Sequence, residues 1–287
     1  DEAELLAQTD LCAVLPITAG WHTEALRDAG ERVVVLAQRL GDLDAEMRGL
    51  SSLSAQTTVA GRYDRTVQDL SPRQQAVVAR TGDPTHAFIA SHGIAMVHLF
   101  QGRLVEAERA YLRSEEQLRI ADPDDAGTLR IPPDRMAGVA HHAGLWSTLL
   151  WMVGDVEGSR RQLERAHAVA SRDGHLQTVW AVWLSHLITG YCDQDPEDVV
   201  HGDRRRREEA GAFRSPVVDA MIGVPAAWGA ARLGDPDALD AMRDRIDELT
   251  TSGAFVFAAI FRGMLADALL HHDRAADALA APQPVQG

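Results

Sequence analysis

Hydrophobic and small residues recur with helical spacing, and the same arrangement returns along most of the chain. After Gly102, such side chains stand two, five, nine and sixteen residues further on, at Leu104, Ala107, Tyr111 and Leu118. These spacings place all four on one face of a helix. Positions 20, 61, 102, 154, about 194, 234 and about 273 anchor the pattern, once with a slip of one residue. The interval is about forty residues, apart from one step of 52.

A repeat of this length predicts a stack of helix pairs. Two helices of about 15 to 18 residues and their turns fill it, and no such unit buries its apolar face without its neighbours. We therefore expect an all-α solenoid of antiparallel helix pairs and no strands. First helices are expected at 42–60, 84–100, 135–152, 175–191, 215–232 and 255–270. Second helices are expected at 21–40, 62–81, 103–120, 155–172, 195–210, 235–251 and 273–281, after an opening helix at 2–18.

The predicted array forms one domain of about seven helix pairs over residues 1–281, and residues 282–287 form a tail. About eleven extra residues at 122–134 cause the long step, and the three prolines and several acids there favour a loop. Two interpretations of this insertion stay open. It is either a tolerated surface loop or a loop that covers a binding groove.

The segment from Gly102 to Tyr111 reads Gly-x-x-x-x-Ala-x-x-x-Tyr and resembles the second-helix half of a tetratricopeptide repeat. Gly93 and Leu99 occupy fitting positions in the helix before it. The interval in this chain is longer than the 34 residues of that family. The resemblance implies a tetratricopeptide-like, right-handed superhelix whose first helices line a concave surface.

Phrases such as Leu36-Ala-Gln-Arg-Leu-Gly-Asp42 and Arg80-Thr-Gly-Asp-Pro84 resemble the C-terminal helical-repeat region of large bacterial ATP-binding transcriptional regulators. These include the LuxR-type large regulators and the antibiotic regulatory proteins of the signal-transduction ATPase class. The resemblance implies an array that receives an inducer or a partner protein while separate domains bind ATP and DNA. The chain has neither a Gly-x-x-x-x-Gly-Lys-Ser/Thr phosphate loop nor a basic helix-turn-helix unit. We expect it to be the receiver piece of a longer protein.

The charge balance changes the picture of possible partners. The 42 acidic and 28 basic residues give a formal net charge of −14, which repels a phosphate backbone and argues against direct nucleic-acid contact. No apolar run reaches the 18 residues of a membrane span. Cys12 and Cys192 are too few for a disulfide framework. We therefore expect a cytoplasmic protein that does not contact membranes.

No residue pattern indicates catalysis or a resident cofactor. The sequence contains no His-Glu-x-x-His and no Gly-x-Ser-x-Gly, and the acidic residues lie mostly on polar helix faces. The adjacent His141 and His142 point about 100° apart on a helix, so both cannot bind one ion. His86, His92 and His98, six residues apart, do not form a stripe either. The prediction is no enzyme, no metal and no cofactor.

Aromatic residues concentrate in the first helices of two successive repeats. Four of the six tryptophans fall there, and helical spacing pairs three of them with histidines or with each other. Tryptophan suits both a helix–helix core and a ligand wall, because it combines a large apolar area with one N–H donor. Core packing is one interpretation. The other predicts a ligand-binding groove lined by His142, Trp146, Trp180, Trp183 and His186.

The preferred functional hypothesis is a sensor or interaction module that binds a small effector or a partner protein on its concave face and controls neighbouring domains. The first alternative is a constitutive protein–protein interaction scaffold, and the second is an enzyme on a helical-repeat scaffold. A homo-oligomer is compatible with all three.

Overall fold

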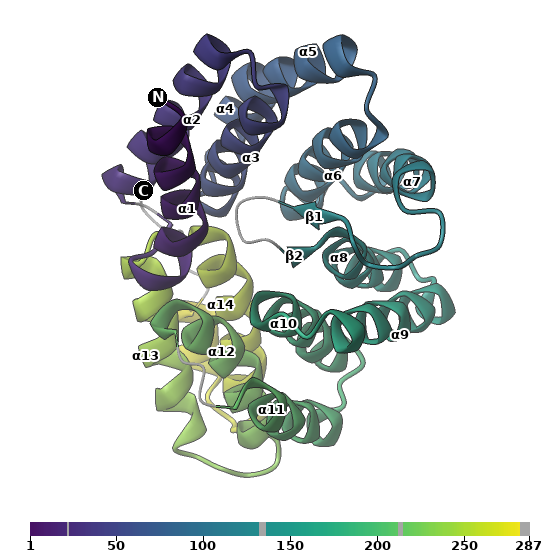
Figure 1. Ribbon diagram of the computed structural model, residues 1–287. Helices are drawn as coiled ribbons and strands as arrows, with labels where there is room; N and C mark the ends of the chain where they lie inside the picture. Colours follow the sequence, from purple (N-terminus) through teal and green to yellow (C-terminus); the bar gives the residue numbers. More distant parts are fainter. Residues whose placement is uncertain (22, 132–135, 212–214, 282–287) are drawn as a thin grey trace.

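The computed structural model describes residues 1–21, 23–131, 136–211 and 215–281 (Figure 1). These residues are helical throughout, apart from turns and one short β-ribbon. The first half contains α1 (Glu2–Thr18), α2 (Glu24–Leu40), α3 (Leu43–Val59), α4 (Tyr63–Arg65), the π-helical turn η1 (Thr66–Leu70), α5 (Ser71–Thr81), α6 (Pro84–Phe100) and α7 (Leu104–Ala121). The second half contains α8 (Gly138–Met152), α9 (Val156–Asp173), α10 (Leu176–Cys192), α11 (Pro196–Ala210), α12 (Pro216–Arg232), α13 (Ala238–Thr251), α14 (Phe255–His271) and α15 (Ala275–Ala280).

The all-α prediction is confirmed, and the helix ends lie close to the expected positions because local signals set them. The carboxylate of Asp42 accepts a hydrogen bond from the Ala45 N–H at 2.8 Å and so caps α3. Gly41, with φ of 72°, ends α2 in the left-handed region, which favours glycine. The tail 282–287 and residues 132–134 of the insertion lie outside the described residues.

Two features differ from the expected scheme. The helix expected at 62–81 is divided into α4, η1 and α5, because Pro72 has no N–H to donate to the preceding turn and a π-turn accommodates the mismatch. The insertion contains a strand although no strands were expected. β1 (Arg130–Ile131) pairs antiparallel with β2 (Met136–Ala137), directly before α8.

The helices divide into two kinds. α6, α8 and α10 contain no Asp, Glu or Arg and bury most of their surface, as expected for helices that are apolar on all sides. Their sequence neighbours α7 and α9 pack on them and turn charged faces to solvent. None of the described helices is both long enough and apolar enough to cross a membrane.

The path of helices returns to its start. α1 contacts α12, and α3 contacts α14, so that helices from the two ends of the described chain lie side by side (Figure 1). We call this junction the seam. Across it, the Trp21 N–H donates to the Ser252 carbonyl at 3.0 Å, and the Ser215 hydroxyl donates to the Ile17 carbonyl at 2.6 Å. One hydrophobic cluster spans the seam and joins Trp21 to the C-terminal helices.

Candidate functional site

A cavity of about 90 Å³ lies where the apolar helices face one another, and we call it the central cavity. Its lining residues come from α3, α5, α6, β1, α8, α10, α12 and α14, together with Trp21. Trp21 and Phe257 border it at the seam, and the Phe257 ring packs edge-on against Phe100 with centroids 6.0 Å apart. The central cavity is therefore bordered by helices from both ends of the described chain.

The polar groups of the central cavity are uncharged. Ser51 and Ser54 of α3 border it, and the Gln74 amide donates to the Ser51 hydroxyl at 3.2 Å. None of the described lining residues is Asp, Glu or Arg. Gly93 of α6 also borders the cavity, and its missing side chain leaves room there, since a Cβ at this position would meet only the Ser54 hydroxyl at 3.9 Å.

Two histidines form a pair in the wall of this cavity. Nε2 of His92 lies 3.0 Å from Nδ1 of His141, and the His92 ring stacks on Phe88 with centroids 5.7 Å apart. Burial, together with the neighbouring histidines, lowers the pKa of His92 well below its usual value. Burial, and then the nearby His142, lower the pKa of His141 to about 4. Both rings are therefore neutral at pH 7.

The insertion reaches the central cavity. Ile131 of β1 is buried and borders it. Further back in the insertion, the guanidinium of Arg165 holds the Asp125 carboxylate at 2.8 to 3.1 Å, and Arg172 donates to the Asp125 carbonyl at 2.7 Å. The described part of the insertion is thus fastened to α9 and supplies one wall of the cavity.

A charged network lies behind the histidine pair. Arg165 also contacts Glu115 at 3.1 Å, and Glu115 in turn lies 3.1 Å from Nε2 of the fully buried His142. Burial on its own raises the pKa of Glu115, but the hydrogen bond from His142 and the charge of Arg165 outweigh it and lower that pKa to about 2. The network anchors α7, α9 and the insertion to α8.

The five residues predicted to line a common groove occupy three places. Trp180, 9% exposed, borders the central cavity. His142 and Trp146 lie in the layer between α7 and α8, where the Trp146 ring stacks on Tyr111 with centroids 5.9 Å apart. Trp183 and His186 border a separate depression of about 450 Å³ between α9, α10 and α11. Their role in ligand binding stays a prediction.

The division between Trp180 and Trp183 has a geometric cause. Residues three apart on a helix differ by about 60° in direction, and α10 is packed on both of its sides. Trp183 therefore turns away from the cavity, toward His167 and the Glu209 carboxylate, to which its N–H donates at 2.6 Å. Spacing along one helix was not enough to assign both rings to one site.

Sequence reasoning missed the pairing of His92 with His141. These residues belong to different helices, α6 and α8, and are 49 positions apart. A local signal does exist in the serines of α3, which stand at helical spacing on a buried face. Buried hydroxyls on a helix need polar partners, which they find in other side chains or in a polar cavity beside the helix.

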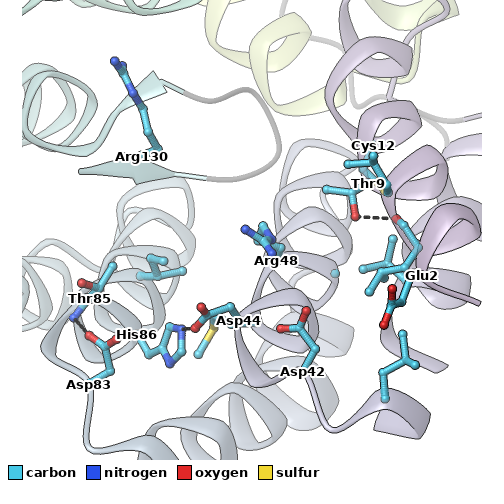
Figure 2. Close-up of a pocket in the computed structure, with 17 residues that line it drawn as sticks. Glu2, Thr9, Cys12, Asp42, Asp44, Arg48, Asp83, Thr85, His86 and Arg130 are labelled. Carbon is cyan, nitrogen blue, oxygen red and sulfur yellow. Dashed lines mark hydrogen bonds and ion pairs between the residues drawn. The ribbon is translucent and has the colours of Figure 1, made fainter. Parts of the chain in front are cut away.

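A second, larger hollow lies between α1, α3 and the start of α6, with a volume of about 900 Å³ (Figure 2). We call it the outer groove. Ligand atoms of Asp44, Asp83 and His86 lie within 4.8 Å of one another there. Nε2 of His86 is 2.9 Å from Asp44, and the Asp83 carboxylate accepts from the Thr85 N–H at 2.7 Å. The carboxylates of Asp44 and Asp83 and the ring of His86 thus already have hydrogen-bond or ion-pair partners within the protein, and they do not require a metal ion to satisfy them.

The central cavity offers neutral imidazoles, hydroxyls and aromatic walls, which suit binding of an uncharged molecule. Comparison of the chain with protein-family models and with curated protein sequences finds no match. The function is therefore inferred from the fold and from the geometry of this cavity.

Proposed function

We propose that the chain is a non-enzymatic sensor module of a bacterial transcriptional regulator, which binds a small effector in the central cavity and so controls neighbouring domains. The observation that carries the proposal is the position of the cavity. Trp21 and α3 line it from one end of the chain, and α12 and α14 line it from the other. A molecule bound there contacts both sides of the seam.

The architecture in this proposal is a tetratricopeptide-like right-handed superhelix with a period of about forty residues, wound until its ends meet. Equivalent turns support it. Gly61, Gly102 and Gly154 each connect a first helix to a second helix, with φ of 70°, 69° and 92°. The regulator context rests on the resemblance of the repeats to the helical region of the large ATP-binding regulators. In that context the module is cytoplasmic and makes no direct nucleic-acid contact.

Binding controls the module if the effector prefers the closed seam. A shift from 1:99 to 99:1 in a two-state equilibrium requires about 5.5 kcal/mol of differential binding. The seam contacts include two hydrogen bonds, each worth about 1 kcal/mol, and the packing of Trp21, worth about 2 to 3 kcal/mol. An effector therefore changes the population fully only if it binds the closed seam about 10⁴-fold more tightly than the open seam.

The outer groove favours one alternative, a constitutive scaffold that holds a segment of a partner protein. Its volume of about 900 Å³ fits a peptide, and its walls carry the carboxylates of Asp42, Asp44 and Asp83 as well as the guanidinium groups of Arg48 and Arg130 (Figure 2). A scaffold of this kind binds its partner in the absence of any effector.

Thermal melting and small-angle X-ray scattering on a set of uncharged metabolites test the proposal. An effector is expected to raise the melting temperature and to change the scattering profile in the same concentration range. Stability and scattering that respond to a partner protein alone, and to none of the small molecules, would support the scaffold instead.

A further inference from the structure

The histidine pair determines whether His141 presents a hydrogen-bond donor or an acceptor to a ligand in the central cavity. His141 borders the cavity, its Nδ1 is engaged with His92, and its Nε2 has no hydrogen-bond partner among the described residues. The chemistry of Nε2 depends on where the two rings carry their protons.

The shared hydrogen bond has two possible arrangements: His92 donates from Nε2 to Nδ1 of His141, or His141 donates from Nδ1 to Nε2 of His92. Burial of His92 decides between them. Nδ1 of His92 is buried and has no partner in the described part of the chain. A buried N–H without an acceptor is rarer in proteins than an acceptor without a donor. The opposite arrangement would place an N–H on this fully buried atom, whereas His141 is a partly exposed ring that borders the cavity. We therefore assign the His92 proton to Nε2, which donates to Nδ1 of His141. The neutral His141 ring then carries its own proton on Nε2, which is a donor.

The walls restrict the rest of the ligand. No Asp, Glu or Arg is among the described lining residues, so these walls offer a charged ligand no counter-ion. The cavity of about 90 Å³ is smaller than the roughly 150 Å³ of an engineered apolar cavity that binds benzene.

We infer that the central cavity takes an uncharged, mainly apolar molecule no larger than about a six-membered ring, whose carbonyl or ether oxygen accepts a hydrogen bond from Nε2 of His141. This inference rests on the proposed function, because it names the ligand class of the same cavity. It goes further in specifying the charge and size of the ligand and its polar contact with His141.

Three probes of similar size test it by isothermal titration calorimetry at pH 7. Cyclopentanone carries the acceptor, benzene lacks it, and cyclopentylammonium carries a charge. Concentrations up to about 10 mM are used, since ligands of six non-hydrogen atoms bind weakly. The variants are His141→Phe, which keeps a ring without the donor, and His141→Gln, which restores an N–H donor near Nε2. His167→Phe is the matched control, because His167 forms a similar pair with His186 at 3.2 Å outside the cavity.

Cyclopentanone is expected to bind the unaltered protein and to bind His141→Phe about tenfold more weakly. Its affinity should be restored in His141→Gln. Benzene binding should be equal in all variants, cyclopentylammonium should not bind, and His167→Phe should behave like the unaltered protein. Equal cyclopentanone binding to the unaltered protein and His141→Phe would overturn the donor assignment, while benzene binding would leave the proposed function standing. Binding of cyclopentylammonium at the cavity would overturn the uncharged class. If no probe binds, this inference is wrong, and the melting and scattering experiment separately decides the proposed function.

Discussion

Replacing Gly20 by alanine tests whether the seam is closed in solution. Gly20 has φ of 97°, and a Cβ there would lie 2.8 Å from the Ser252 carbonyl oxygen across the seam. Gly234 has nearly the same φ, 99°, and a Cβ there would meet nothing within 4 Å. Both substitutions carry the conformational penalty of a positive φ, about 1 to 2 kcal/mol. Only Gly20→Ala also forces the seam apart.

The extra loss follows from the displaced contacts. The hydrogen bond from the Trp21 N–H to Ser252 contributes about 1 kcal/mol, and partial exposure of the Trp21 ring adds to that. Gly20→Ala is therefore expected to lower the free energy of unfolding by at least about 1 kcal/mol more than Gly234→Ala. The corresponding difference in melting temperature is about 2 to 4 °C. Urea denaturation and calorimetry measure both quantities. Equal losses in the two variants would refute a closed seam.

Three further predictions concern the cavity and its walls. Gly93→Ala on α6 and the control Gly263→Ala on α14 should each raise the free energy of unfolding by about 1 kcal/mol, which denaturation measures. Only Gly93→Ala should weaken ligand binding in calorimetry, because its new methyl group alone fills part of the cavity. Burial lowers the pKa of His92 and brings that of His141 to about 4, so the unfolded chain binds protons on these rings more tightly than the folded chain. The free energy of unfolding should therefore be constant above about pH 6.5 and fall as the pH drops toward 4, by at most about 3 kcal/mol for His141. Melting curves should show a smaller fall in His141→Phe. Asp125→Ala should lower the free energy of unfolding by about 1 kcal/mol and speed hydrogen exchange in β1, whereas unchanged exchange would mean that Arg165 does not hold the insertion.

The helices were predictable from the sequence because their ends depend on neighbouring residues. A glycine such as Gly41 or a cap such as Asp42 acts over three or four positions, and the apolar stripes repeat within each helix. The division of the helix before Pro72 and the two-residue strand at Arg130–Ile131 depend on geometry that hydrophobic spacing does not record.

The seam and the central cavity were not predictable in the same way. The contact of Trp21 with Ser252 joins residues more than two hundred positions apart, and the spacing of residues within one helix does not record such a contact. Of the five residues in the predicted aromatic groove, Trp180 borders the central cavity. The choice between Trp180, which borders the cavity, and Trp183, which does not, required the packing on both sides of α10.

If the proposal is right, a ligand that fills the cavity stabilises the seam. Hydrogen exchange of the Trp21 amide measures this most directly, because that N–H donates across the seam to the Ser252 carbonyl. At a free ligand concentration of ten times the dissociation constant, a ligand that binds only the closed seam should slow exchange of this amide about tenfold. The turn amide of Gly154, which donates to the Trp151 carbonyl, is the control and should not change. Unchanged exchange at Trp21 under saturating ligand would contradict the account.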